Sequence, residues 1–213
     1  QFTRAPAFRP EPESERVRDV AARLAKAQKP VIVAGGGVIR SQAQAEVVEL
    51  AEALQIPVVT SLNAKATIVD AHPLAVGVSG LYSRDSANRV VLEADLVFFI
   101  GSHTGGQVTH NWIFPKRGTP VIQLDINPAE LGRNYPNVAS ILGDAKVSLR
   151  RLIDVAPRKK PQDAQAWLAR VQQIKAEWRA AHEPMRNSDA VPIRPERICK
   201  EISEALPANG ILV

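Results

Sequence analysis

The chain has 213 residues, of which 45% are hydrophobic and 23% charged, and 27 basic against 22 acidic side chains give a net charge of +5. This composition is typical of a globular protein, and its basic residues are too dispersed, apart from short clusters such as 158–160, to predict a nucleic-acid partner. The chain has a single cysteine, Cys199, which excludes an internal disulfide and a cysteine zinc cage. It has no apolar run of about 20 residues and no signal-peptide pattern, so we predict a cytoplasmic protein without a membrane partner.

Residues 1–13 hold three prolines and few apolar side chains, which predicts an extended interdomain linker with a further domain before it. A helix is expected from Ser14, because apolar side chains recur there at helical spacing. Pro30 closes the connection to the next element.

The next segment predicts a strand, a helix and a second strand. Residues 31–34 form a β-branched run that ends in three glycines, as a buried parallel strand does when it enters a tight turn. Ser41 is expected to cap a helix over residues 42–54, and residues 57–60 follow as the second strand. Together they make a βαβ unit.

The same alternation continues to residue 157. Further strands are expected at residues 74–78, 95–100, 120–124 and, more weakly, 140–142, with helices over 84–93 and from Asp144. We therefore predict an α/β fold over residues 14–157: a doubly wound, six-stranded parallel sheet, Rossmann-like, with helices on both faces.

After Pro157 the composition changes. Residues 158–191 are interpreted as a linker followed by a long amphipathic helix whose apolar face includes Trp167 and Trp178. A second helix is expected to begin at Pro195, and the apolar residues 211–213 indicate the start of a strand. Residues 192–213 are therefore interpreted as the beginning of a further, truncated domain.

Glycine turns at strand ends suggest a ligand site, because ligands of open parallel sheets bind at the carboxyl ends of the strands. Residues 35–37 lack a Cβ that would keep a phosphate from the backbone N–H groups, although a tight strand-to-helix turn explains them equally well. The third glycine of the nicotinamide fingerprint is missing, and residues 60–62 hold no ribose-binding acid, so ordinary NAD binding is disfavoured.

The acid instead follows a later strand. Asp125 is placed to accept hydrogen bonds from ribose hydroxyls, and the alternative is that it caps a turn. Residues 101–106 and 143–145 add two more glycine turns, which together favour an extended, dinucleotide-shaped groove. The histidine spacing does not favour a metal site, and no serine has the surroundings of a hydrolase nucleophile.

In order and spacing, these motifs resemble the central domain of the acetolactate synthase, pyruvate oxidase and oxalyl-CoA decarboxylase family of thiamine-diphosphate-dependent enzymes. The resemblance covers roughly residues 13–157. The matching stretches are KPVIVAGGGV at 29–38, IPVVTS at 56–61, HP at 72–73, ADLV at 94–97, IQLDINPAE at 122–130 and GDA at 143–145.

This resemblance implies an adenine-nucleotide groove, since the domain binds FAD in some members, ADP in others and nothing in many. Two departures weaken the nucleotide contacts: His103 stands where the family often has arginine, and Asn127 where it often has a second aspartate. The cofactor-binding residues carried over by similarity are Gly36, Gly37, Thr60, Leu62, Gly101, Ser102, Asp125, Asn127, Asp144 and Ala145.

The resemblance also implies that the fragment is not catalytic alone. The family's activating glutamate lies in an N-terminal domain and its magnesium motif lies beyond Val213, so thiamine diphosphate and Mg²⁺ are expected only in the full-length parent, together with the missing N- and C-terminal domains and a homo-oligomeric assembly. The parent would decarboxylate a 2-keto acid and ligate or transfer the product.

Two other interpretations stay open. The chain is alternatively a stand-alone flavin- or adenine-nucleotide-binding module of similar fold, or a structural domain with an empty groove. A deacylase-like NAD domain is disfavoured, because the single Cys199 cannot build its zinc ribbon.

Overall fold

The computed structural model describes residues 8–159, 161–207 and 209–212. Part of the expected linker 1–13 and the last residue of the expected strand 211–213 therefore lie outside the described residues. The chain divides into two compact units, Gln1–Val171 and Gln172–Val213. In the part of the chain that the structure describes, no helix is both long and apolar enough to cross a membrane.

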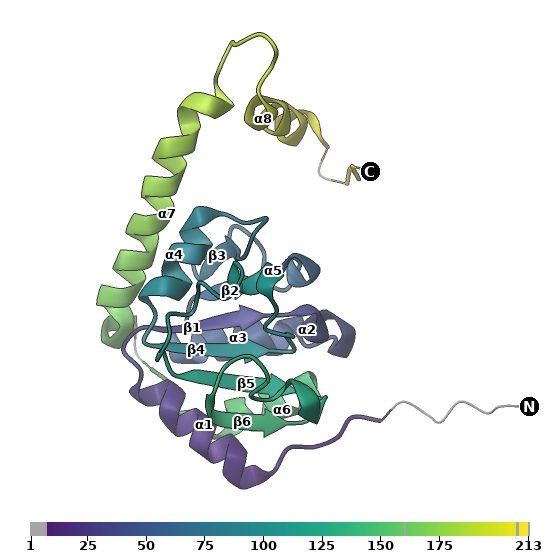
Figure 1. Cartoon of the computed structure of the whole chain (residues 1–213), viewed down its shortest axis with the longest axis vertical. Coiled ribbons are helices and arrows are strands. Elements are labelled where there is room, and N and C mark those ends of the chain that lie inside the picture. The colour runs from purple at the N-terminus through teal and green to yellow at the C-terminus, as the bar shows by residue number, and fades with distance from the viewer. Residues whose placement is uncertain (1–7, 160, 208, 213) are drawn as a thin grey trace, which may run out of the picture. The chain divides into compact units, whose positions relative to one another are not determined.

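The first unit is built on one parallel sheet, seen at the centre of Figure 1. Its strands lie in the order β3-β2-β1-β4-β5-β6, so that β1 and β4 sit side by side where the chain changes direction across the sheet. This arrangement confirms the doubly wound, six-stranded prediction. The strands are β1 (Pro30–Ala34), β2 (Val58–Thr60), β3 (Ala75–Val78), β4 (Leu96–Ile100), β5 (Val121–Asp125) and β6 (Asn137–Leu142).

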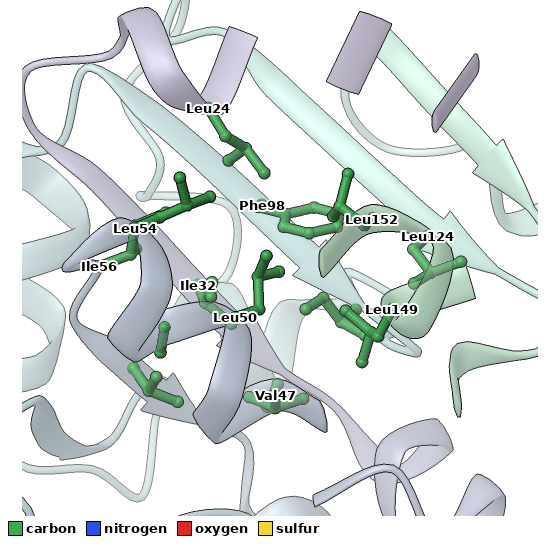
Figure 2. Packing of buried hydrophobic residues seen from close by; sticks show 14 of the residues in the cluster. Leu24, Ile32, Val47, Leu50, Leu54, Ile56, Phe98, Leu124, Leu149 and Leu152 are labelled. Carbon is green, nitrogen blue, oxygen red and sulfur yellow. The ribbon is translucent and has the colours of Figure 1, made fainter. Parts of the chain in front are cut away.

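Helices cover one face of the sheet with a single apolar cluster. Helices α1 (Ser14–Lys26) and α3 (Gln44–Leu54) each contact α6 (Ala145–Val155), because all three turn a buried stripe inward. Figure 2 shows how leucines of these helices surround the strand residues Ile32 and Phe98, which are fully buried. Continuous apolar strands of this kind require cover on both faces.

The alternate strand residues, such as Val33 and Phe99, are equally buried and point to the other face. Helix α4 (Asp85–Glu93) contacts β3 there, and the first turns of α7 (Gln165–Arg186) join it. Trp167 Nε1 donates to the carbonyl oxygen of Pro30 at 2.9 Å, and Arg170 pairs with Glu93 at 2.6 Å. The packing of α7 residues up to Val171 thus belongs to the first unit.

The turn after β1 differs from the prediction. Instead of a turn leading to a helix capped by Ser41, the chain forms a short helix, α2 (Gly36–Ser41), that ends at Gln42 in a left-handed conformation, φ 55°. Helix α3 then starts at Gln44 without a side-chain cap, so Ser41 as its N-cap was wrong. The reason is that the glycines are compatible with an immediate helix start, and the Ser41 hydroxyl instead bonds residues of α6.

Other boundaries differ less. Strand β6 begins at Asn137, three residues earlier than predicted. The structure also contains short helices, which are η1 (Leu62–Ala64), α5 (Gly106–Thr109), η2 (Pro128–Glu130) and η3 (Pro161–Ala164). The second unit contains most of α7, from Gln172 on, and helix α8 (Pro195–Ala205), which begins at Pro195 as predicted. Residues 211–212 are not a strand, because an extended segment needs a neighbouring strand to bond, and the six described strands pair with one another.

Candidate functional site

A groove lies at the carboxyl ends of the strands, where the segments that follow all six strands meet. Its volume is about 710 Å³. Sites for small molecules and cofactors commonly have volumes of about 300–1,000 Å³. The crossover between β1 and β4 brings loops from both halves of the sheet to one place, which is the position expected for a ligand in this fold.

The structure brings nine of the ten predicted site residues into this groove. They come from five loops: Gly36, Gly37, Leu62, Gly101, Ser102, Asp125, Asn127, Asp144 and Ala145. Thr60 is the exception, because it is buried at the end of β2, where its carbonyl oxygen accepts from the Ser79 N–H at 2.9 Å. Its neighbour Ser61 lines the groove instead.

Three of the glycines are required by packing. A Cβ on Gly35 would lie 2.2 Å from the carbonyl oxygen of Gly101, and a Cβ on Gly37 would lie 2.8 Å from the Gly101 Cα. Gly101 itself has φ +57°, where a side chain is strained. The loops after β1 and β4 therefore pack backbone against backbone, and the Gly37 N–H donates to the Gly101 carbonyl at 3.0 Å.

Asp125 is the carboxylate at the end of β5. Its Oδ1 accepts from the Asn127 N–H at 2.9 Å, and Asn127 Oδ1 accepts in turn from the Ala129 N–H at the start of η2. Burial raises the pKa of Asp125, and the nearby Glu130 adds to this, although the Asn127 hydrogen bond and His103 act in the opposite direction. A hydroxyl donor in the groove would stabilise the ionised form of this carboxylate.

Glu130 is a buried carboxylate with two exposed partners, and it was not predicted as a site residue. Its Oε1 lies 3.1 Å from His103 Nδ1 and 2.9 Å from Arg133 Nη1, and among the described residues its buried Oε2 has no hydrogen-bond partner. Asn134 Nδ2 donates to the carbonyl oxygens of His103 and Thr104, which holds the loop after β4 in place. His103 is thus directed to Glu130 at the edge of the groove.

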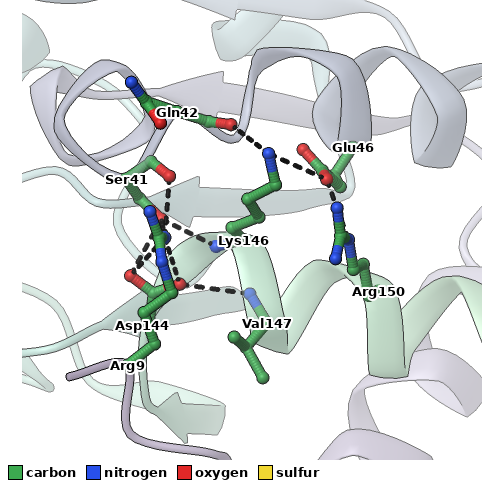
Figure 3. Close-up of polar contacts among 8 residues, drawn as sticks. All are labelled: Arg9, Ser41, Gln42, Glu46, Asp144, Lys146, Val147 and Arg150. Carbon is green, nitrogen blue, oxygen red and sulfur yellow. Dashed lines mark hydrogen bonds and ion pairs between the residues drawn. The ribbon is translucent and has the colours of Figure 1, made fainter.

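The carboxylate of Asp144 occupies the N-terminus of α6. Figure 3 shows it between Arg9 and Ser41. Arg9 Nη1 lies 2.9 and 3.1 Å from its two oxygens, Ser41 Oγ donates to it at 2.9 Å, and the Val147 N–H donates at 3.2 Å, as expected of an N-cap. Burial alone would raise the pKa of Asp144, but these hydrogen bonds outweigh burial and lower it.

Arg9 belongs to the extended segment before α1 and was not predicted as a site residue. The segment is held at the groove because the Asp144 N–H donates to the Pro10 carbonyl at 2.9 Å, and because Glu11 pairs with Arg151 at 3.0 Å. No local pattern could have identified this contact, since Arg9 and Asp144 are 135 residues apart in the sequence.

A second ionic group lies beside Asp144. Glu46 on α3 is nearly buried and lies 3.5 Å from Lys146 and 3.0 Å from Arg150, both on α6, as Figure 3 shows. Lys146 Nζ also donates to the Gln42 carbonyl at 3.0 Å. Within residues 8–159, 161–207 and 209–212, no three side chains of His, Cys, Asp or Glu gather as a metal site would require.

Comparison with known proteins gives a consistent result. Residues 17–152 match the family described as "Thiamine pyrophosphate enzyme, central domain". The chain is 36% identical over 190 residues to the probable acetolactate synthase large subunit of Methanocaldococcus jannaschii. The aligned region covers 89% of this chain and 32% of that protein. It is 31% identical over 206 residues to glyoxylate carboligase of Escherichia coli O157:H7, covering 94% of this chain and 34% of that protein.

A third relative, acetolactate synthase of Mycobacterium avium, is 29% identical over 215 residues, with 98% of this chain and 34% of that protein covered. The chain therefore spans about a third of the length of the curated relatives that it matches.

Proposed function

The chain belongs to the family of thiamine pyrophosphate enzyme central domains, and from this premise we propose that it is the central part of a longer acetolactate synthase-like enzyme. In that enzyme it serves as a scaffold between an N-terminal and a C-terminal domain, and its groove holds an adenine nucleotide, FAD or ADP. The coverage of the relatives, about a third of their length, supports the assignment to one domain of several.

The single observation that carries the nucleotide proposal is the convergence of all six strand ends on one groove. The Gly36 backbone lines the groove at the start of α2, and Asp125 offers a carboxylate to ribose hydroxyls. These donors and acceptors fit the ribose and phosphate groups of an adenine nucleotide. A flavin, when bound, would supply a redox-active ring or serve as a structural group.

The proposed parent is a cytoplasmic homo-oligomer that decarboxylates a 2-keto acid and ligates or transfers the resulting carbanion. Thiamine diphosphate and Mg²⁺ would supply that chemistry in the other domains. The names of the relatives, acetolactate synthase and glyoxylate carboligase, support a carboligating transferase. We propose no catalytic residue within this chain.

A second candidate is a purely structural domain. It is favoured by two observations: backbone packing and the positive φ of Gly101 explain Gly35, Gly37 and Gly101 without a ligand, and Asp144 is already bonded to Arg9 and Ser41. In this case the loops would close the sheet and the groove would hold no cofactor.

Calorimetric titration of the purified chain with FAD, ADP and NAD, together with its absorbance spectrum, separates the two candidates. Micromolar binding of FAD or ADP, equivalent to about −8 kcal/mol, would support the nucleotide groove, and Asp125→Ala should weaken it. If neither nucleotide binds, the scaffold alone remains. The parent activity is tested on the longer polypeptide, by measuring carbon dioxide release from 2-keto acids with thiamine diphosphate and Mg²⁺ present.

A further inference from the structure

The positively charged side chains in and around the groove differ in whether an acidic side chain is already paired with them. Arg40, near the end of α2, lines the groove and is exposed. Among the described residues its side chain makes no hydrogen bond or ion pair, so its guanidinium is free to bind a ligand. An arginine guanidinium matches phosphate geometry with two parallel hydrogen bonds, which makes it a strong phosphate-binding group.

The other cations around this wall are already paired. Arg9 is bonded to Asp144 and Ser41, Lys146 and Arg150 both pair with Glu46, and Arg133 pairs with Glu130 on the far side of the sheet's switch point. His103, which lines the groove, is likewise directed to Glu130. Among the described residues that line the groove, Arg40 is therefore the arginine or lysine whose side chain remains available to an anion.

Pairing of Arg9 with Asp144 also matters for an anion near Arg40. Asp144 lines the same wall, because Ser41, the residue after Arg40, donates to its carboxylate at 2.9 Å. Without Arg9 this carboxylate would repel a phosphate, since like charges at short range disfavour binding. With Arg9 bonded to both carboxylate oxygens, the charge of Asp144 is balanced, and the positive charge of Arg40 on this wall is not opposed by it.

We propose that Arg40 is the phosphate-binding residue of the groove, and that the groove selects a nucleotide with a diphosphate over the corresponding nucleoside. The proposal rests on the proposed function and deepens it. Asp125, on the strand-end side of the groove, takes the ribose hydroxyls, while Arg40 takes the phosphate and Arg9 removes the competing charge of Asp144.

The test is a calorimetric titration of the full chain with ADP and adenosine, comparing wild type with Arg40→Gln and Arg40→Lys. Arg18→Gln is the matched control, since Arg18 is an exposed arginine on α1 that does not line the groove. We expect Arg40→Gln to weaken ADP binding about tenfold, equivalent to about 1.4 kcal/mol, with adenosine affected less than about twofold. Arg40→Lys should be intermediate, because the charge remains and the paired geometry is lost.

Salt dependence gives a second readout that does not require measurable adenosine binding. Wild-type affinity for ADP should fall with added salt, and the fall should be smaller in Arg40→Gln. If wild type binds ADP and Arg40→Gln matches it in affinity and salt dependence, or weakens adenosine equally, the Arg40 assignment is overturned while the groove proposal stands. If wild type binds neither ADP nor adenosine, the Arg40 assignment is overturned, and if it does not bind FAD either, the groove proposal is overturned as well.

Discussion

Replacing Asp144 with alanine should destabilise the first unit by about 1.5–4 kcal/mol. The change removes the N-cap acceptor of α6, typically about 0.5–2 kcal/mol, and leaves the Ser41 hydroxyl without its acceptor, about 1 kcal/mol. The ion pair with Arg9 adds little, about 0–1 kcal/mol, because the Arg9 side chain is 41% exposed and screened by water.

Urea unfolding of the chain, followed by circular dichroism at 222 nm, measures this loss. Asp144→Asn is the matched variant, since its amide oxygen can still accept from the Val147 N–H; it should lose about 1 kcal/mol. Arg9→Ala should lose less than Asp144→Ala. The reasoning is refuted if Asp144→Ala changes the free energy of unfolding by less than about 0.5 kcal/mol, below the range of a lost N-cap, or if both Asp144 variants lose equal amounts.

The pH dependence of the same variants tests the ionic part. Because the folded-state pKa of Asp144 is lowered, its carboxylate stabilises the fold above its unfolded pKa of about 3.9, and this stabilisation disappears as the pH falls through the folded pKa. The difference in unfolding free energy between wild type and Asp144→Asn should therefore be constant from neutral pH to about 5 and shrink below about 4. A difference that stays the same at pH 3 would contradict this assignment.

Three other changes test the fold and the groove. Gly35→Ala should prevent stable folding, because its Cβ would lie 2.2 Å from the Gly101 carbonyl oxygen. The loss would be measured as the absence of soluble protein that unfolds cooperatively. Gly105→Ala is the control and should fold normally, because its Cβ would have no atom within 4 Å. Phe98→Ala should lower the free energy of unfolding by about 3–5 kcal/mol, since this fully buried ring would leave a cavity. Asp125→Asn should not lower stability at pH 7: burial raises the folded pKa of Asp125, so ionisation opposes folding above that pKa and the amide removes this penalty. A clear loss of stability in urea unfolding at pH 7 would show that the charge of Asp125 is needed for folding.

Local patterns were sufficient for the architecture of the first unit. Buried parallel strands require continuous apolar runs, so β1, β4 and β5 were recognisable from their sequence alone, and the strand-end glycines marked the loops that meet at the groove. The N-cap role of Asp144 was also predictable, because a cap is a contact between residues three apart. The early part of β6 was missed, since this strand lies at the sheet edge and its exposed side chains give no apolar run.

The contacts that shape the groove were decided by tertiary structure. Ser41 looked like the cap of the following helix, but the fold places it against α6, where it bonds Asp144 and the Lys146 N–H. The Arg9 contact with Asp144 joins the segment before the first helix to the last helix of the sheet domain. Periodicity and turn chemistry act over a few residues, whereas the partner of a charged side chain depends on which distant loops the sheet brings together. The sequence by itself therefore determined the six strands and the longer helices, and the tertiary structure decided which charges in the groove are neutralised and which remain for a ligand.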